Sequence, residues 1–547
     1  MKLNYNNVKP LACVKDMIND QDKKNTLAFR YISGKEEKSL TYGELFEKTI
    51  YLGTALMNKG YSKKRISCIG KNSFSWALVY LTTLTSDNVF VPVDKELPAD
   101  DIINVINHSE ADILFCDKKY VEPLNEKKEK FLKDIEFVVF DDESNSFEKL
   151  VEEGKELYEN GDLSFKNLEP NPVTDLKMIL YTSGTTGLSK GVMLSEKNII
   201  SCVYYGLRMF NVHESCLSVL PYHHSFESVC GILVSLHFGS TICINSDLKE
   251  VTRNLKRFKP GFIEIVPAFA ELFYRKIIKN IQQKGKEKGF KILLKVSKFL
   301  LSFGIDIRKK AFKEIHEVFG GNLKLIVCGG AALRPEIGRF FNDIGITTIT
   351  GYGITECSPL VSGNPPYCND PVTVGFPLEC VEVKIDNPSA DGIGEIVVKG
   401  DTVMLGYYKA PELTDEVLKD GWFYTGDYGK FNKKGQLIIT GRKKNMIVLN
   451  NGKNVFPEEL EDYISGIEGV KEVLVYSKKD EKGIESGLTA IVYPDEEAKL
   501  TEDEIKHHIT AVLSHLPVYK QIQNVVLRNE PFEKTTTNKI KRQNYIN

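Results

Sequence analysis

The chain has 547 residues, a length at which one hydrophobic core gives way to two or more domains, and 42% of its residues are hydrophobic, as in a globular enzyme. Lys and Arg (72) nearly balance Asp and Glu (74), so the net charge of -2 excludes a global field that would favour nucleic acid or another acidic polymer. The eleven cysteines form no C-x-x-C pair, and His213 near Cys216 offers too few ligands for zinc.

The cysteines are typical of a reducing cytoplasm, where most are small buried apolar residues. Residues 1–15 lack the apolar core of a secretory signal. No uninterrupted apolar run approaches the roughly 18 residues needed to cross a bilayer. We therefore expect a cytoplasmic protein.

From about residue 26 to 141, short β-rich apolar runs alternate with helical patterns. The runs are residues 66–69, 89–93 and 137–140, and the clearest helical pattern is 42–59. The rhythm returns after residue 175, with strand-like runs at 178–181, 217–220, 262–266 and 323–327. Such alternation predicts α/β structure with a largely parallel sheet.

After about residue 371 the pattern changes to short strands and turns, including 381–385, 394–399 and 436–439. This predicts a β-rich subdomain, and a small α+β unit is expected from about residue 445. The predicted fold is therefore α/β: a large N-terminal domain of two α/β subdomains plus a β-rich subdomain, with a small mobile α+β C-terminal domain.

A segment rich in Gly, Ser and Thr follows the strand-like run at 178–180. It reads Tyr181-Thr-Ser-Gly-Thr-Thr-Gly-Leu-Ser-Lys190-Gly191. Glycine lets the backbone approach phosphate oxygens closely, while N–H groups, hydroxyls and the lysine supply donors and positive charge. It is not a Walker A loop, because the position five after Gly184 is Ser189 and no glycine precedes the lysine there. The alternative is an ordinary surface turn.

The segment resembles the phosphate loop of the adenylate-forming superfamily, which includes acyl-CoA synthetases, adenylation domains and luciferases. Further family motifs follow in order and cover most of the chain. They are Leu220-Pro-Tyr-His-His224-Ser-Phe-Glu227, Gly329-Gly330-Ala331, Gly351-Tyr-Gly-Ile-Thr355-Glu356, Trp422-Phe-Tyr-Thr425-Gly-Asp427, Gly441-Arg442-Lys443-Lys444 and Lys534-Thr-Thr-Thr-Asn538-Lys539-Ile540.

The resemblance implies a role for each motif. Phosphate binding falls to Thr182, Ser183, Gly184, Thr185, Thr186, Gly187 and Lys190. The adenine and ribose sites are assigned to Gly330, Ala331, Tyr352, Gly353, Asp427 and Arg442. The catalytic set is Lys539, with Thr355 at the α-phosphate, Glu356 as the Mg²⁺ ligand and His224 between the acid and the thiol.

Each role has a physical reason and an ordinary alternative. The ring of Tyr352 offers a stacking face worth about 1–3 kcal/mol to a base, unless it is a core tyrosine. Glu356 is a hard oxygen ligand suited to Mg²⁺, or a solvated surface acid. Asp427 can accept two ribose hydroxyls, as ribose-binding acids do, or simply cap a turn. Lys539 places a cation where the pentacoordinate phosphorus accumulates charge, or belongs to a solvated basic tail.

The other three assignments also have ordinary alternatives. Thr355 could cap a helix instead of contacting phosphate. The rigid fork of Arg442 suits ribose or phosphate oxygens but also a surface ion pair. For His224, a satisfied pocket histidine is as good a reading as a gate.

Five positions depart from the family pattern and bear on turnover rate rather than on reaction class. They are Ser189, Glu196, Asn445, Glu533 and Asn538. Asn tolerates positive φ better than most residues, so the turn before Lys539 is expected to survive the replacement of glycine by Asn538.

The implied reaction has two steps. A carboxylic acid attacks the α-phosphate of Mg-ATP to give acyl-AMP and pyrophosphate, and the thiol of CoA, a co-substrate, then takes the acyl group and releases AMP. The implied domains are 1–441, which binds AMP and the acyl chain, and 442–547, which carries Lys539 and turns about a hinge near Lys444.

The chain also resembles long-chain acyl-CoA synthetases at Val266-Pro267, in a helical insert at 272–319 and at 320–330. A medium- or long-chain fatty acid is therefore the expected substrate. Alternatives sharing the first step are an acyl-acyl-carrier-protein ligase and a stand-alone acid-activating adenylation enzyme. A silent nucleotide- or lipid-binding protein and a luciferase-type oxygenase share the fold.

Residues 275–313 hold 13 Lys and Arg but 2 Asp and Glu, a local charge of +11 in a chain whose remainder carries -13. Ile292, Leu293, Val296, Phe299, Leu300 and Phe303 fall on one helical face. Lys291, Lys295 and Lys298 cluster away from it, a basic amphipathic pattern. We expect weak peripheral contact with an anionic membrane at its inner surface, with a solvated basic face over a core helix as the equal alternative.

Overall fold

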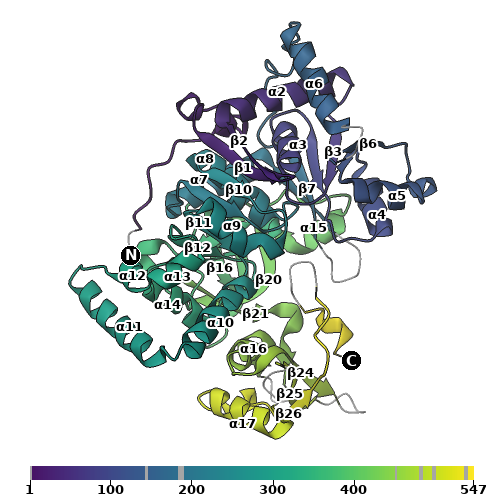
Figure 1. Cartoon of the computed structure of the whole chain (residues 1–547). Helices are drawn as coiled ribbons and strands as arrows, with labels where there is room; N and C mark the ends of the chain where they lie inside the picture. The colour runs from purple at the N-terminus through teal and green to yellow at the C-terminus, as the bar shows by residue number, and fades with distance from the viewer. Residues whose placement is uncertain are drawn as a thin grey trace. The chain divides into compact units, whose positions relative to one another are not determined.

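The computed structural model describes residues 3–141, 146–182, 190–449, 453–479, 485–495, 500–534 and 540–546. The chain forms two compact units (Figure 1). The first comprises Met1–Glu382 and Lys399–Phe423, and the second Val383–Val398 and Tyr424–Asn547. The second unit thus includes residues that precede the predicted domain boundary at 441/442. That boundary and the hinge near Lys444 stay predictions.

One sheet of the first unit has seven strands. Its order is β18 (Gly406–Tyr407), β8 (Lys190–Ser195), β7 (Leu176–Thr182), β4 (Val89–Pro92), β3 (Arg65–Ile69), β5 (Ile113–Cys116) and β6 (Glu136–Val139). The strands from β7 to β6 are parallel, whereas β8 and β18 are antiparallel additions. All four residues of β5 are buried, because helices on both faces of a parallel sheet require near-continuous apolar strands.

The other sheet of this unit has nine strands. Its order is β15 (Phe376–Pro377), β14 (Leu360–Gly363), β13 (Thr347–Gly353), β12 (Leu325–Cys328), β11 (Phe262–Ile265), β9 (Ser215–Ser218), β10 (Thr241–Ile244), β1 (Leu27–Ser33) and β2 (Glu36–Thr41). From β13 to β1 the pairing is parallel, so these strands end at one edge.

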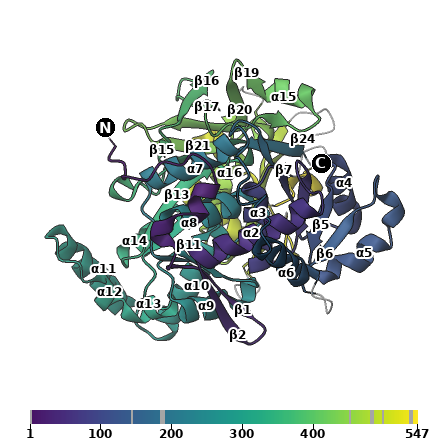
Figure 2. The same ribbon diagram turned by 90° about the horizontal axis from the view of Figure 1, so that it is seen from above.

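Helices cover these sheets (Figures 1 and 2). They are α1 (Lys15–Ile18), α2 (Tyr42–Asn58), α3 (Phe74–Leu84), α4 (Ala99–Ser109), α5 (Val121–Asn125), α6 (Ser146–Glu159), α7 (Glu196–Met209), α8 (Val234–Phe238), α9 (Val251–Phe258), α14 (Pro335–Asp343) and α15 (Pro411–Val417). A capping box between Thr41 and Glu44 starts α2. A π-helical segment, η4 (Phe226–Leu233), leads directly into α8.

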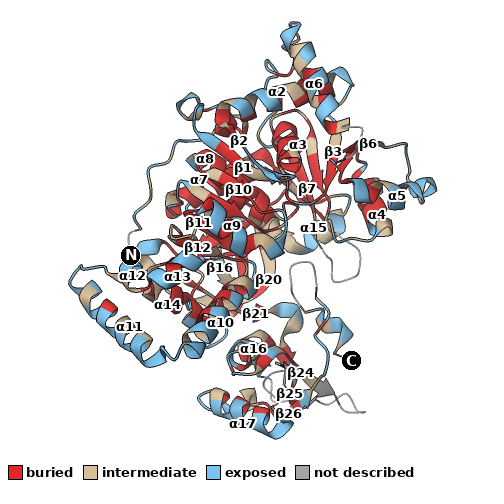
Figure 3. Cartoon of the chain, viewed as in Figure 1, coloured by how far each residue is buried: buried red, intermediate tan, exposed pale blue. Residues whose placement is uncertain are grey.

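The predicted insert at 272–319 is helical, as expected. It comprises α10 (Pro267–Gln283), α11 (Glu287–Ser302), α12 (Arg308–Ala311) and α13 (Lys313–Val318). Phe273 and Ile277 of α10 are buried in a core shared with Ile326 of β12 and Phe341 of α14. This side of the insert is therefore part of the first unit's interior (Figure 3).

The predicted β-rich and small α+β regions lie mostly in the second unit, although residues 399–423 of the β-rich region belong to the first. A five-stranded sheet runs β16 (Val381–Asp386), β17 (Gly394–Gly400), β20 (Trp422–Phe431) and β19 (Leu418–Lys419), with β21 (Leu437–Arg442) on β20. A hairpin of β22 (Ile447–Val448) and β23 (Asn454–Val455) follows. The last sheet is β24 (Val470–Lys479), β25 (Glu485–Pro494) and β26 (Asn524–Leu527), packed with α16 (Pro457–Ser465) and α17 (Glu502–Leu513) around one core.

The α/β fold class is confirmed, and the predicted strands are present with ends shifted by at most three residues. At 217–220 the strand ends at Ser218, because the Leu220 N–H donates to the carboxylate of Glu227 at 3.1 Å instead of to a neighbouring strand. Nine of the eleven cysteines are buried, as expected. Across the described ranges, no helix is both long and apolar enough to span a bilayer.

Candidate active site

The carboxyl edge of the nine-stranded sheet gathers several predicted site residues. Strands β9, β12 and β13 lead there into the segments that carry His224, Gly330 with Ala331, and Tyr352. The crevice outside the carboxyl ends of parallel strands is where open α/β sheets bind ligands. The segments after β9 and β12 pack closely together there, because a Cβ at Gly329 would lie 3.0 Å from the Phe226 ring.

Tyr352, Gly353, Thr355 and Glu356 lie where β13 ends. Tyr352 is buried and pairs with Ser362 of β14. Gly353 is required by packing, because a Cβ there would lie 2.2 Å from the Pro359 carbonyl oxygen. A single 3₁₀ turn, η6 (Thr355–Cys357), then leaves the Thr355 and Glu356 side chains half-buried at the edge of the sheet.

Glu356 is joined to the predicted phosphate loop through Tyr407. The Tyr407 hydroxyl donates to Glu356 Oε1 at 2.9 Å. On its face, the ammonium of Lys190 lies 5.0 Å from the ring centroid, within cation–π range. Burial, and then the neighbouring carboxylate, raise the pKa of Tyr407, so it stays a neutral donor. The structure thereby brings a predicted metal ligand and a predicted phosphate-binding cation onto one aromatic side chain.

Sequence reasoning missed Tyr407. It lies on β18, where it pairs with Val192 of β8, and its N–H donates to the Thr414 hydroxyl at 2.9 Å. Further support comes from Asn198, whose amide donates to the carbonyls of Asp401 and Val403. No spacing rule connects position 407 with 190 or 356, so only the tertiary pairing identifies it.

The hairpin of β7 and β8 carries the predicted phosphate loop. Thr182 and Lys190 are the last paired residues before the segment that connects the two strands. Ser183, Gly184, Thr185, Thr186 and Gly187 lie outside the described residues, as does Ser189. Their assignment to ATP phosphates remains a prediction, although the two positions that bracket them are directly opposite one another.

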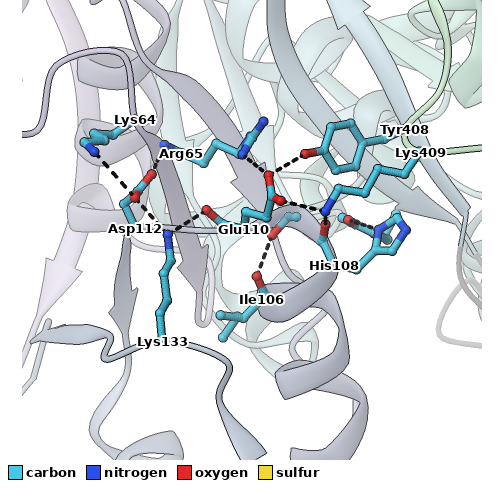
Figure 4. A network of polar contacts seen from close by, with 11 residues as sticks. Lys64, Arg65, Ile106, His108, Glu110, Asp112, Lys133, Tyr408 and Lys409 are labelled. Carbon is cyan, nitrogen blue, oxygen red and sulfur yellow. Dashed lines mark hydrogen bonds and ion pairs between the residues drawn. The ribbon is translucent and has the colours of Figure 1, made fainter.

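A polar network braces this hairpin from outside. Figure 4 shows Arg65, Tyr408 and Lys409 converging on the exposed carboxylate of Glu110, with donor–acceptor distances of 2.6, 2.9 and 2.9 Å. These contacts, led by the hydrogen bond from Lys409, lower the pKa of Glu110 to about 2. Because the Tyr408 N–H donates to the Gly191 carbonyl at 2.7 Å, the network holds the strand that carries Tyr407.

The same network reaches the other strand of the hairpin. His108 Nδ1 and the Tyr181 hydroxyl are 2.8 Å apart. Burial, with the nearby charge of Lys409, lowers the pKa of His108, so the neutral ring can accept this hydrogen bond. Both ends of the predicted phosphate loop are therefore anchored to α4 and the segment that follows it.

The segment that carries His224 is held from two sides. On one side, Glu227 accepts hydrogen bonds from the Ser218 hydroxyl and the Leu220 N–H. On the other, buried Asn72 donates to the Leu220 carbonyl at 2.7 Å. The ring centroids of His224 and His223 lie 4.4 Å apart with the planes inclined at 45°, and burial depresses the pKa of His223 well below its usual range.

Two buried carboxyls, Glu227 and Glu264, are near each other at this segment, and neither has an ion pair among the described residues. Burial raises the pKa of Glu227 to about 8. Burial, and then the neighbouring Glu227, raise the pKa of Glu264 on β11. At neutral pH Glu227 is therefore mostly a protonated acid that acts as a polar packing group rather than as a charge.

In the second unit, the predicted ribose residues are neighbours. Asp427 of β20 pairs across the sheet with Arg442 of β21, and Arg442 Nε lies 3.2 Å from Asp427 Oδ1. Glu395 supports the turn beside them by accepting from the Gly426 N–H and from Lys443. A buried acceptor beside a half-exposed planar donor is an arrangement that can bind the hydroxyls of a ribose.

Lys539 lies outside the described residues, but the residues on either side of 535–539 are anchored within the second unit. A β-bridge joins Lys534 to Ile540. Lys534 pairs with Glu472 at 2.7 Å. Nη1 of Arg542, three residues beyond Lys539, donates to both carboxylate oxygens of Glu461 at 2.7 and 2.8 Å.

The described departures from the family pattern have structural roles. The buried carboxylate of Glu196 accepts from the Val14 N–H at 2.7 Å and fixes the N-terminal segment. Asn445 donates to Glu458, and Glu533 accepts from Asn544. Asn538 is not among the described residues.

No cluster of three or more His, Cys, Asp and Glu side chains gathers in the part of the chain that the structure describes. A metal site there rests on one carboxylate, Glu356. That donor set suits Mg²⁺, which binds through one or two carboxylates with the remaining positions taken by phosphate oxygens and water.

Comparison with protein families gives two matches. A model described as AMP-binding enzyme matches residues 18–408, and one described as AMP-binding enzyme C-terminal domain matches residues 459–539.

Curated relatives are long-chain-fatty-acid–CoA ligases. Long-chain-fatty-acid–CoA ligase 5 of Rattus norvegicus is 32% identical over 499 residues, covering 84% of this chain and 72% of the relative. Long chain acyl-CoA synthetase 4 of Arabidopsis thaliana is 28% identical over 506 residues, covering 85% and 75%. Among solved structures, ATP-bound MatB from Rhodopseudomonas palustris has a TM-score of 0.78 at 23% identity and 97% coverage of each chain, which establishes the fold.

Replacement of Glu110 by Gln should raise the KM for ATP in an adenylation assay by about two- to five-fold, the range of an exposed ion-pair network. The amide keeps the size of the side chain but loses the charge on which three donors converge. The matched control is Asp100→Asn, since Asp100 is a half-exposed acid at the start of α4 whose ion pairs within the described ranges are with Lys127 and Lys130. An equal effect of both substitutions would contradict a specific bracing role.

Glu227→Gln should flatten the pH dependence of stability between about pH 5.5 and 8. In this window the folded protein keeps a proton that the unfolded chain has lost, because the pKa is 4.5 unperturbed and about 8 when buried. Stability therefore falls as pH rises, by about 1.4 kcal/mol per unit for one such group. Urea unfolding across this range measures the slope. Glu214→Gln is the control, because its carboxyl has a pKa lowered by Lys324 and titrates below the window.

Proposed function

The chain belongs to the family of AMP-binding enzymes, and on that premise we propose that it is an ATP-dependent fatty acid:CoA ligase. The supporting observation is the Lys190–Tyr407–Glu356 connection at the sheet edge that also carries His224 and Tyr352. Its curated relatives are named as long-chain-fatty-acid–CoA ligases. They do not favour a carrier-protein ligase or a stand-alone adenylation enzyme.

In the first step, a carboxylate oxygen of the fatty acid attacks the α-phosphorus of ATP and pyrophosphate leaves. Lys190 and the loop after Thr182 hold the phosphates, while Thr355 donates to the α-phosphate. Glu356, kept in place by the Tyr407 hydroxyl, is the residue that would hold Mg²⁺. Bound to the phosphates, the metal supplies positive charge that offsets their repulsion of the incoming carboxylate. Lys539 adds a cation as the pentacoordinate phosphorus forms.

In the second step, the thiol of CoA attacks the acyl carbon and AMP leaves. His224 lies on the segment between the acid and the thiol. Domain 442–547 turns about Lys444 between the two steps, so that Lys539 serves the first step only. Ribose hydroxyls bind to Asp427 and Arg442, which are already paired across the sheet.

Residues 275–313 also make weak peripheral contact with an anionic membrane in this proposal. Their charge of +11 supports it, as does the absence of any acid in this stretch besides Glu287 and Asp306. Basic residues near an anionic surface contribute about 1 kcal/mol each, within a Debye length of about 10 Å. Fatty acid dissolved in a bilayer would thereby be concentrated near the enzyme.

Purified protein should release AMP from ATP in the presence of Mg²⁺, CoA and a medium- or long-chain fatty acid. A panel of acids of graded length, with CoA or acyl carrier protein as acceptor, identifies the substrate class and the thiol. Preference for acetate or an amino acid, or transfer to the carrier protein alone, would contradict the proposal.

Lys539→Ala should slow adenylation by about 100- to 1000-fold, the usual effect of losing one preorganised electrostatic group. Thioester formation from supplied acyl-adenylate should be largely retained, because the lysine serves only the first step. Single-turnover release of pyrophosphate and formation of acyl-CoA measure the two steps separately.

Lys444→Pro should have the opposite effect on the two steps and serves as the control for this experiment. Proline fixes φ at the proposed hinge, so adenylation should be retained while acyl-CoA formation slows. If the two rates fall together in both variants, neither assignment to a single step holds.

A further inference from the structure

Helix α11 presents a line of apolar side chains to solvent. Ile292, Val296, Phe299 and Phe303 are 63%, 44%, 64% and 67% exposed. They follow one another at intervals of three or four residues, so they share one face of the helix. Contiguous exposed apolar groups of this size mark interaction sites rather than ordinary surface.

The opposite face of α11 is already occupied. Leu293 and Leu294 pack against the core of the first unit, and Ser297, about one turn further along the helix, is buried. Lys298 pairs with Asp343, the last residue of α14, at 2.7 Å. Figures 1 and 2 both place α11 at the outer edge of the first unit, and Figure 3 shows it largely exposed. The helix is therefore anchored through one side and open on the other.

Lysines line the apolar face. Lys288, Lys291 and Lys295 are exposed and lie on one flank of the Ile292–Phe299 line, and among the described residues none of the three has a carboxylate within ion-pair distance. Near the end of the helix, the Phe299 and Phe303 rings stack edge to face at 5.0 Å. Apolar side chains flanked by unpaired lysines match an interface whose headgroups are anionic and whose interior is apolar.

From this arrangement we infer that α11 inserts its Ile292–Phe303 face into the headgroup region of an anionic bilayer, lying parallel to the surface. The inference rests on the proposed membrane contact and deepens it, because the contact is apolar insertion as well as charge attraction. A second copy of the chain fits the face poorly, since a symmetric contact would set these lysines against each other. The occupant is the lipid interface.

Binding of the full-length protein to vesicles of phosphatidylcholine, with and without phosphatidylglycerol, tests this by sedimentation. Wild-type protein should need the anionic lipid and should keep part of its binding when salt rises from about 0.1 M to about 1 M, where the Debye length falls to about 3 Å. Ile292→Ser with Phe299→Ser should weaken binding by about tenfold or more. Lys288, Lys291 and Lys295 changed to Gln should weaken it at low salt.

The control pair is Leu132→Ser with Val518→Ser, because these apolar side chains are 83% and 85% exposed elsewhere and should leave binding unchanged. A Phe299→Trp variant reports depth, since brominated acyl chains should quench its fluorescence. If the double Ser variant binds like wild type while the Gln variant does not, insertion is wrong and the electrostatic contact stands. If wild type does not sediment, both are wrong. If the Ser variant instead dissociates a dimer of the chain, the face is a protein interface and the inference fails.

Discussion

The hydrogen bond from Tyr407 to Glu356 joins the two sheets of the first unit where the candidate site lies. Tyr407 belongs to the edge strand of the seven-stranded sheet, and Glu356 follows a strand of the nine-stranded sheet. Neither sheet alone fixes the position of the Tyr407 hydroxyl relative to the Glu356 carboxylate. The register of β18 on β8 and the turn after β13 must both be right before the predicted phosphate-binding and metal-binding groups meet. Asn198 and the Glu110 network both support the pairing of β18 with β8.

A different constraint shapes the segment that carries His224. Two carboxyls, Glu227 and Glu264, are buried there with no ion pair among the described residues, and burial raises the pKa of each. A neutral acid can still satisfy backbone donors, as Glu227 does for Leu220, without introducing a buried charge. The consequence is a stability that declines toward alkaline pH.

The net charge of the chain conceals a strongly basic segment. A chain of net charge -2 contains a stretch of +11, and Lys288, Lys291 and Lys295, which have no ion pair within the described part of the chain, lie beside exposed apolar residues on α11. Between α10 and α11, by contrast, Lys284 and Lys286 are paired with Glu314. The whole segment is basic, but it is the lysines of α11 without an ion pair in the described residues that lie beside its exposed apolar face.

The sequence by itself determined the fold class, most strand positions and the family, because these depend on local periodicity and on short contiguous motifs. It placed Tyr352, Gly353, Thr355 and Glu356 together because they are neighbours in the chain. It was silent on Tyr407, whose relation to Lys190 and Glu356 exists only after β18 pairs with β8. It also left α11 undecided: Leu293 and Ile292 look alike in a helical pattern, yet one packs on the core and the other faces solvent. Periodicity identifies a helix with apolar sides, but which side is buried depends on where the rest of the chain folds, and only the tertiary structure decides that.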